Sequence, residues 1–237
     1  MQTCTDQRRD VARSRGRPWV RLQAGVSLDG RTALDNGLSQ WINGEKSRID
    51  SHAWRHRADA VLTGIGTVLA DDPRLDVRLV PAQSQPLRVV LDSKLRTPAT
   101  ARLFDAPGPI RIYTGGISDP REIPLRERGA VIRELADASG QIDLADVMRD
   151  LSRAGVQEIH VEAGARLNGA LLRAGLVDEL LVYVAPKLLG TGAGLAAIGT
   201  LQSLDEALTL RIRSLDLIGT DVRLILQCEA ISPGFEA

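Results

Sequence analysis

Short apolar runs alternate with amphipathic stretches along most of this 237-residue chain. Runs rich in β-branched residues predict strands at 19–24, 60–63, 87–92, 110–114, 130–135 and 158–162. Helical patterns lie between them, at 44–57, 67–71, 143–154 and 165–174. Nearly continuous runs such as RVVLD and IRIYT indicate strands that are buried on both faces. The alternation predicts an α/β fold, with helices on both faces of a mostly parallel central sheet.

The pattern changes after residue 178. The segments DELLVYVAP, LRIRSLDLIG and DVRLILQC all have strand-like composition, and the last two are joined by a short connection. We therefore expect an antiparallel hairpin at the carboxyl end, which makes the sheet mixed. The glycine-rich segment 190–197 has the composition of a mobile loop. Residues 1–16 are polar and rich in arginine, which predicts a flexible tail, and residues 17–230 are expected to form a single domain.

Composition and charge exclude several classes of protein. Lysine plus arginine total 30, as do aspartate plus glutamate, so the net charge is zero and no nucleic-acid partner is expected. No run approaches the ~18 apolar residues of a membrane span, and the first residues lack the apolar core of a signal peptide. With only Cys4 and Cys228, no disulfide framework is expected, and the cytoplasm is the expected compartment.

Two of the predicted strands run into a glycine turn and then a helix. In AVLTGIGTVLADDP, Thr67 can cap a short helix whose amino end faces an anion, although such GxG turns are also common as plain structure. In IHVEAGARLNGALL, Glu162 ends a strand and Gly164 precedes a helix, the position where open α/β sheets bind ligands. Glu162 could equally support the helix start and remain solvated.

A third segment combines a turn with side chains suited to a planar ligand. Asp29 and Gly30 form the turn in VSLDGRT, and Ser39, Gln40 and Trp41 offer hydroxyl, amide and indole groups. The alternative is a β-hairpin with a partly buried Trp41.

His52 and His56 lie four residues apart on a predicted helix. No third ligand follows at a recognisable spacing, so no metal site is expected. The arginines of the same helix would ordinarily be a solvated face, although Arg55 lies next to the apolar Trp54.

Several blocks carry a resemblance when they are taken in order: RPWVRLQAGVSLDGRTALDNGLSQWI, AVLTGIGTVLADDPRLDVR, LRVVLDS and VEAGARLNGALLRAGLVDELLVYVAPKLLG. They resemble the reductase domain of the bacterial riboflavin-biosynthesis deaminase-reductase, which has a dihydrofolate-reductase-like fold. The resemblance implies NADPH-dependent reduction of a phosphorylated pyrimidine-sugar substrate, 5-amino-6-(5-phosphoribosylamino)uracil, to 5-amino-6-(5-phosphoribitylamino)uracil. It also implies a homodimer, for which apolar strands such as LLVYVAP could provide the contact or could simply be core.

The resemblance assigns roles to individual residues. Its cofactor-binding positions correspond to Gly25, Trp41, Thr67, Asp71, Ser93, Gly164, Ala165, Arg166, Leu167, Asn168, Gly169 and Ala170. Its substrate-binding positions correspond to Ser39, Arg55, Leu75, Arg78 and Glu162, with the two arginines as the natural partners of the phosphate. The reaction must also protonate the sugar's ring oxygen, and the candidate catalytic residues for this step are Glu162 and Asp29.

One part of the family pattern is missing. The bifunctional relatives carry a zinc deaminase marked by a His-x-Glu segment together with a PCxxC segment, and this pairing does not occur here. We therefore expect a stand-alone reductase, or the reductase portion of a larger protein, that needs a deaminase from elsewhere. The departure leaves open reduction of the undeaminated diaminopyrimidinone, of a side-branch pyrimidine or of a pterin imine. It also leaves open a catalytically silent nucleotide-binding partner of a deaminase.

Overall fold

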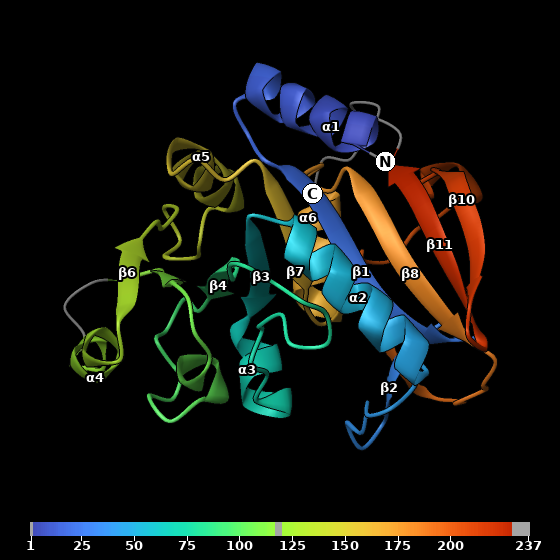
Figure 1. Ribbon diagram of the computed structural model, residues 1–237, viewed down its shortest axis with the longest axis horizontal. Coiled ribbons are helices and arrows are strands. Elements are labelled where there is room, and N and C mark those ends of the chain that lie inside the picture. The colour runs from blue at the N-terminus through green and yellow to red at the C-terminus, as the bar shows by residue number, and fades with distance from the viewer. Residues whose placement is uncertain (1, 117–119, 229–237) are drawn as a thin grey trace. The chain divides into compact units, whose positions relative to one another are not determined.

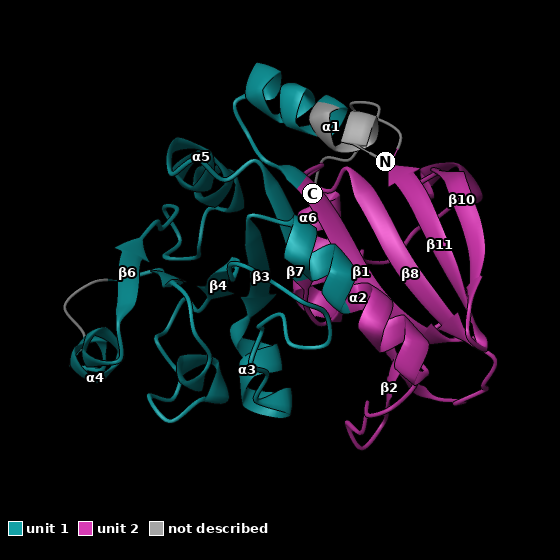
Figure 2. Cartoon of the chain, viewed as in Figure 1, with its two compact units in different colours: residues 1–19, 52–161 teal, residues 20–51, 162–237 magenta. Residues whose placement is uncertain are grey.

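The structure, a computed structural model, describes residues 2–116 and 120–228, and of residues 2–6 the backbone only. The chain forms two compact units, and each unit combines two separate stretches of sequence (Figure 2). Unit 1 contains residues 1–19 and 52–161, and unit 2 contains residues 20–51 and 162–237. Of the three boundaries along the chain, the one between residues 51 and 52 falls inside helix α2 (Glu45–Arg57). The expectation of a single domain over residues 17–230 therefore stays a prediction.

Unit 1 contains five parallel strands in the order β7-β3-β4-β5-β6. They are β3 (Ala60–Gly64), β4 (Leu87–Leu91), β5 (Ile110–Thr114), β6 (Ala130–Glu134) and β7 (Glu158–Glu162). Each bound lies within one residue of the strand predicted from its apolar run. The agreement follows from burial, because the interior residues of β3 and β4 have almost no exposed surface.

Short helices accompany these strands: α3 (Ile65–Asp71), η1 (Arg102–Asp105), α4 (Glu122–Glu127) and α5 (Leu144–Arg153). Val68 of α3, Leu103 of η1 and Leu125 of α4 join Val90 and Ile112 of the sheet in one apolar core. Helix α5 begins at a side-chain cap, because the carboxylate of Asp143 accepts from the amide of Asp146 at 2.9 Å.

The amino-terminal segment differs from the expected flexible tail, since residues Gln2–Arg15 form helix α1 (Figure 1). Ala12 is buried, and Arg9 forms an ion pair of 3.2 Å with Asp59. Arg8 and Arg15 lie over the ring of Trp19, 5.7 and 5.6 Å from its centre. The arginines that suggest a solvated tail in the sequence thus have partners in unit 1.

Unit 2 pairs a parallel strand with an antiparallel hairpin. Strand β1 (Trp19–Ser27) runs parallel to β8 (Glu179–Ala185), and β11 (Asp221–Cys228) runs antiparallel to β8. Strand β10 (Leu210–Ile218) pairs with β11 through a turn at Gly219, whose φ of +67° suits a tight hairpin. The predictions of an α/β fold, a mostly parallel sheet and an antiparallel carboxyl-terminal hairpin are confirmed.

A small second sheet corrects two expectations. Strand β2 (Arg31–Leu34) pairs antiparallel with β9 (Gly192–Gly194), so the turn at Asp29 does not close a hairpin between β1 and β2. The segment 190–197 is not a free loop, because the guanidinium of Arg31 donates to the carbonyls of Gly190 and Gly192. Helix α6 (Ala165–Arg173) and the short η2 (Leu204–Glu206) complete the elements of unit 2. No helix in the described part of the chain is long and apolar enough to span a membrane.

A buried ion pair joins β1 to β8. Arg21 and Glu179 lie opposite each other in the register, and Arg21 Nε donates to Glu179 Oε1 at 2.7 Å. Their side chains are 0% and 5% exposed. A charge removed from water to this degree depends on its partner.

Replacing Glu179 with Ala should therefore destabilise the protein strongly, because the buried Arg21 guanidinium would lose the carboxylate to which its Nε donates. We expect a loss of about 3–5 kcal/mol in the free energy of unfolding, measured by urea denaturation. Asp146→Ala is the control, since its pair with Arg149 is about half exposed and should contribute about 0–1 kcal/mol. Equal effects of the two substitutions would contradict the role given to the buried pair.

Candidate active site

The predicted site residues fall into two groups, and each group is held within one unit. Unit 1 carries Arg55, Thr67, Asp71, Leu75, Arg78 and Ser93. Unit 2 carries Gly25, Asp29, Ser39, Trp41, Glu162 and the run 164–170.

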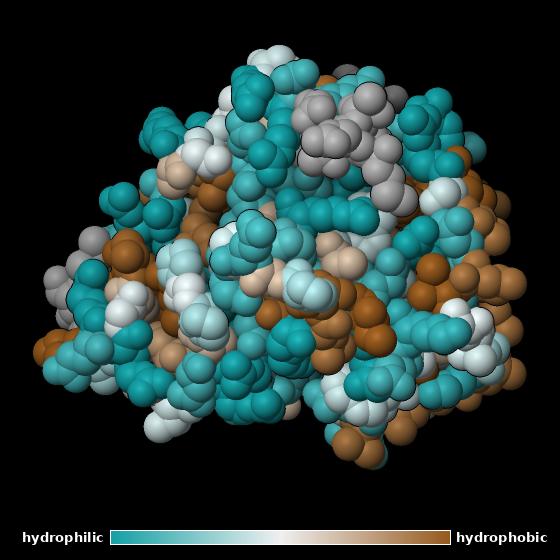
Figure 3. All heavy atoms as spheres, in the orientation of Figure 1, coloured by the Kyte–Doolittle hydropathy of each residue, from teal (hydrophilic) through white to brown (hydrophobic). Residues whose placement is uncertain are grey.

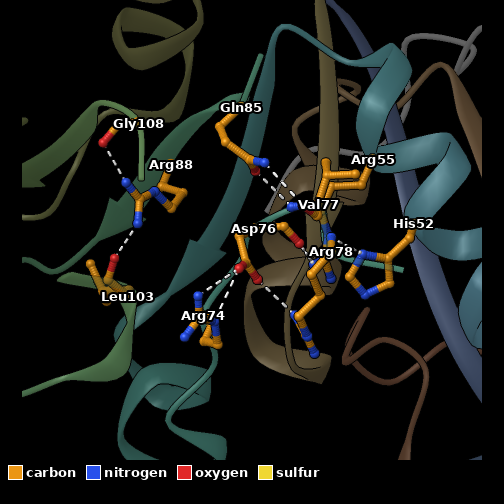
Figure 4. Close-up of polar contacts among 10 residues, drawn as sticks. All are labelled: His52, Arg55, Arg74, Asp76, Val77, Arg78, Gln85, Arg88, Leu103 and Gly108. Carbon is orange, nitrogen blue, oxygen red and sulfur yellow. Dashed lines mark hydrogen bonds and ion pairs between the residues drawn. The ribbon is translucent and has the colours of Figure 1, made fainter. Parts of the chain in front are cut away.

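The segment that follows α3 in unit 1 forms a cluster of arginines around one carboxylate (Figure 4). Asp76 accepts from Arg78 Nη1 at 2.7 Å and from Arg74 Nε at 3.0 Å. Burial would raise the pKa of Asp76, but the hydrogen bonds from Arg78 and Arg74 outweigh it, and the pKa lies below its ordinary value. Asp76 is thus an ionised carboxylate that orients two guanidinium groups.

Three further side chains fix the backbone of this segment. The amide of Gln85 accepts from the backbone N–H of Val77 at 2.7 Å and donates to its carbonyl at 3.0 Å. Arg55 donates to the carbonyl of Asp76, and His52 Nδ1 accepts from the N–H of Arg78 at 3.2 Å. The structure therefore brings the predicted residues Arg55 and Arg78 together around the buried Leu75–Asp76 backbone.

Sequence reasoning missed Arg74, Asp76, Gln85 and the role of His52. The sequence PRLDVR was the available signal, because it places an arginine two residues before and two residues after one aspartate. No local pattern indicated that Gln85 bonds the backbone of Val77, because the two residues meet only when the loop between them folds. Among the described residues, no three His, Cys, Asp or Glu side chains are grouped as metal ligands.

The turn at α3 differs in detail from the prediction. Helix α3 begins at Ile65 and its N-cap residue is Gly64, so the prediction that Thr67 caps the helix is wrong. Thr67 lies inside the helix because the backbone turns two residues earlier than the GxG pattern suggests. Asp71 is its last residue and is exposed.

A second carboxylate shapes the loop that carries Ser93 in unit 1. Asp92 is fully buried, and its Oδ2 accepts from both the N–H and the hydroxyl of Thr97 at 2.7 Å. This bond closes a loop in which Lys94 and Arg96 are exposed while Ser93 is half-buried.

Glu162, the last residue of β7, is the one residue of that strand that falls in unit 2, and Gly164 precedes α6. The buried Asn168 donates to the carbonyls of Ala163 at 3.1 Å and Leu195 at 2.8 Å. A Cβ at Gly169 would overlap the backbone of Ala197, whose own N–H donates to Ala165 at 2.8 Å. The start of α6 is thereby fastened to the segment 195–197.

Asp29 makes several hydrogen bonds within unit 2. Its carboxylate accepts from the hydroxyl of Ser27 at 2.5 Å and from the N–H groups of Leu189 at 3.1 Å and Gly190 at 2.7 Å. The bond from Ser27 and the amide of Leu189 contribute most to lowering the pKa of Asp29 to about 2. Such a group carries no proton at neutral pH and is a poor candidate for the proton donor.

Gly25 and Trp41 each lie against a polar side chain of unit 2, Asn43 and Arg48 respectively. A Cβ at Gly25 would overlap the side chain of Asn43, which donates to the carbonyl of Tyr183 at 3.0 Å. Trp41 is 58% exposed, and the β-hairpin of the alternative interpretation does not form because β2 pairs with β9. The guanidinium of Arg48 lies over the ring of Trp41, 4.3 Å from the centre, in a cation–π contact. Ser39 is half-buried.

A buried tyrosine was also missed by sequence reasoning. Tyr183 Oη donates to Asp50 Oδ2 at 2.7 Å, and Arg223 donates to the same oxygen at 2.8 Å. Burial and the bond to Asp50 raise the pKa of Tyr183 above its ordinary value, so its phenol remains neutral.

Known proteins match most of this chain. Residues 18–224 match the family described as the RibD C-terminal domain. The riboflavin biosynthesis protein RibD of Escherichia coli K12 is 42% identical over 224 residues, which cover 89% of this chain and 60% of that protein. The chain therefore spans less than two thirds of that relative.

Solved structures agree with this match. RibD of Acinetobacter baumannii superposes with a TM-score of 0.81 at 34% identity, covering 92% of this chain and 60% of that one. A Thermotoga maritima diaminohydroxyphosphoribosylaminopyrimidine deaminase/5-amino-6-(5-phosphoribosylamino)uracil reductase gives a TM-score of 0.76 at 25% identity, with coverage of 91% and 58%.

Replacing Asp29 with Asn should destabilise the protein in a pH-dependent way. Because the folded pKa of about 2 lies below the ordinary value, the charge stabilises the fold above about pH 4 and loses its effect as the pH falls toward 2. The wild-type advantage in melting temperature should therefore be largest near neutral pH and shrink steadily on acidification. An advantage that grows toward low pH would contradict the ionised state of Asp29.

Proposed function

This chain belongs to the RibD C-terminal domain family, and from that premise we propose that it is an NADPH-dependent oxidoreductase of riboflavin biosynthesis. The proposed reaction reduces 5-amino-6-(5-phosphoribosylamino)uracil to 5-amino-6-(5-phosphoribitylamino)uracil. The proposed compartment is the cytoplasm, and the proposed source of the substrate is a separate deaminase.

The observation that carries this proposal is the arginine cluster around Asp76. Arg55 and Arg78, two of the residues assigned to the substrate, both bond to the segment that contains this carboxylate. A phosphate is bound well by guanidinium groups that are already oriented, because little side-chain freedom is then lost on binding. A pterin has no matching anion, so the cluster favours a phosphorylated substrate.

The residues proposed to hold the cofactor suit its charges and rings. The first amides of α6 have no partner inside the helix, and a Cβ at Gly164 would meet no atom within 4 Å, so a pyrophosphate could approach there. Trp41 offers an exposed ring, and the exposed Lys94 and Arg96 beside Ser93 suit the 2′-phosphate. NADPH, when bound, supplies the hydride that is added at C1′ of the sugar. Thr67 and Asp71 are proposed as further contacts.

Glu162 is the proposed proton donor. Opening of the ribose ring breaks the bond between C1′ and the ring oxygen, and the freed oxygen needs a proton. Of the two carboxylates nominated for this role, Asp29 accepts from Ser27, Leu189 and Gly190 and remains ionised. We therefore propose that Glu162 donates the proton and that Asp29 stabilises the loop at 187–190 through its hydrogen bonds.

We also propose that two copies associate through the outer hairpin of unit 2. Ile212, Leu215 and Leu217 of β10 are 61%, 61% and 75% exposed. Their register partners on β11 are Leu226, Leu224 and Val222, so one face of the hairpin is apolar (Figure 3). Exposed apolar faces of this kind mark interaction sites. All apolar residues of β8 except Val184 are buried, so the expectation that LLVYVAP makes the contact is not retained.

The function is tested by loss of NADPH absorbance with 5-amino-6-(5-phosphoribosylamino)uracil, run beside the undeaminated diaminopyrimidinone. Glu162→Gln should lower kcat roughly 100- to 10,000-fold, as expected for removal of a general acid, while the melting temperature stays near that of the wild type. If only the undeaminated compound is turned over, that compound and not 5-amino-6-(5-phosphoribosylamino)uracil is the substrate. A wild-type kcat in the Glu162→Gln variant would remove Glu162 from the mechanism.

The assembly is tested by light scattering of the protein as it elutes from a sizing column. Leu215→Arg should shift the mass from dimer to monomer, because a guanidinium would be buried without a partner in the apolar interface. Leu204→Arg is the matched control, since Leu204 is 93% exposed and lies on η2. This part of the proposal would be refuted if the Leu215→Arg variant still had the mass of a dimer, or if the wild-type protein had the mass of a monomer.

A further inference from the structure

The arginine cluster of unit 1 contains one guanidinium to which neither the sequence nor the resemblance gives a role. Arg74 lies two residues before Asp76, and its Nε and Nη2 atoms lie 3.0 and 2.9 Å from Asp76 Oδ2. Arg78 bonds the other oxygen, Oδ1, at 2.7 Å. Figure 4 shows the two guanidinium groups reaching Asp76 from opposite sides of the carboxylate.

Burial distinguishes the carboxylate from the two arginines. The side chain of Asp76 is 4% exposed, whereas those of Arg74 and Arg78 are 31% and 45% exposed. The acceptor is therefore inside and the donors are at the surface. Each guanidinium has five N–H groups, and Asp76 engages only part of each set, so donors remain for an incoming anion.

The charges of the cluster do not cancel. Arg74 and Arg78 bring two positive charges to the single negative charge of Asp76. The nearest other carboxylate in the sequence, Asp72, accepts instead from the N–H of Arg102 at 2.8 Å. An excess of fixed positive charge is what a doubly charged phosphate requires.

The backbone beneath the cluster is fixed on several sides. Gln85 binds both the N–H and the carbonyl of Val77, and His52 accepts from the N–H of Arg78. Such a segment loses little conformational entropy when a ligand binds. The arginines are thus presented at the surface by a rigid support.

From this geometry we propose that Arg74 is an additional ligand of the substrate's phosphate and that Asp76 is the positioning residue that holds Arg74 and Arg78 as a pair. Together they set the preference for phosphorylated over dephosphorylated substrates. This inference rests on the proposed function for the identity of the substrate, but the phosphate site itself can be tested without turnover.

The binding experiment uses ribose 5-phosphate as the probe, with ribose as the uncharged comparison, in titration calorimetry on the full chain. Arg74→Ala should weaken ribose 5-phosphate about 10- to 100-fold, the range for a hydrogen bond to a charged group, and Arg74→Lys should recover part of the loss. Asp76→Asn keeps the shape of the side chain but removes its charge, and should weaken binding about 10-fold. Arg128→Ala, which removes an exposed arginine paired with Asp105, is the matched control and should change nothing.

The kinetic experiment compares phosphorylated and dephosphorylated substrate. Arg74→Ala and Asp76→Asn should raise KM for the phosphorylated compound with little change in kcat, and should leave kcat/KM for the dephosphorylated compound as in the wild type. A substitution that merely loosens the fold would lower both values of kcat/KM together, and that result would overturn the proposal. So would unchanged ribose 5-phosphate binding in Arg74→Ala. Binding that behaves as expected in a chain that turns over neither pyrimidine would uphold the phosphate site and refute the proposed function.

Discussion

A charge that leaves water has to be paired, and the loops and strand ends of this protein depend on that constraint. Arg21 is fully buried and meets Glu179 across two strands. Arg88, also buried, donates instead to the carbonyls of Leu103 and Gly108, where it holds a loop beside β4. In both cases the guanidinium donates to oxygen atoms of the protein in place of water. Removing one member of such a pair lowers the free energy of unfolding by more than the pair contributes to it, because the other member remains buried without its partner.

The same constraint builds the loops that carry the candidate site. Asp29, Asp76 and Asp92 each lie in a turn or loop, and each accepts hydrogen bonds from residues of that loop or of a facing one. A loop cannot satisfy its polar groups in a ladder or a helix, so a carboxylate that accepts several of them gives it one preferred conformation. The exposed side chains on these loops, such as Arg78 and Lys94, are then presented by a fixed backbone. A site for a charged ligand benefits from this arrangement because its donors are oriented before binding.

Net charge and local charge lead to different conclusions in this protein. The chain as a whole is neutral, with 30 basic and 30 acidic residues, which argues against a broad electrostatic surface for nucleic acid. The carboxylate of Asp76 nevertheless pairs with two arginines, Arg74 and Arg78. A small anionic ligand is recognised by a few fixed donors at short range, so overall neutrality does not argue against it. The proposed phosphorylated substrate is consistent with both observations.

The sequence by itself determined the strands and helices of the parallel region, because a buried apolar run or an amphipathic repeat is a local signal. It also determined the carboxyl-terminal hairpin, the glycine turn before α6 and, through the family resemblance, the two arginines that the structure brings together. Only the tertiary structure decided the pairing of β2 with β9, the helix at residues 2–15 and the exposure of Trp41. It also decided that Asp29 is held by residues 160 positions away and that Gln85 supports Val77. The physical reason is that a polar or charged residue takes its role from whichever partner satisfies it, and those partners are separated along the chain and meet only when it folds.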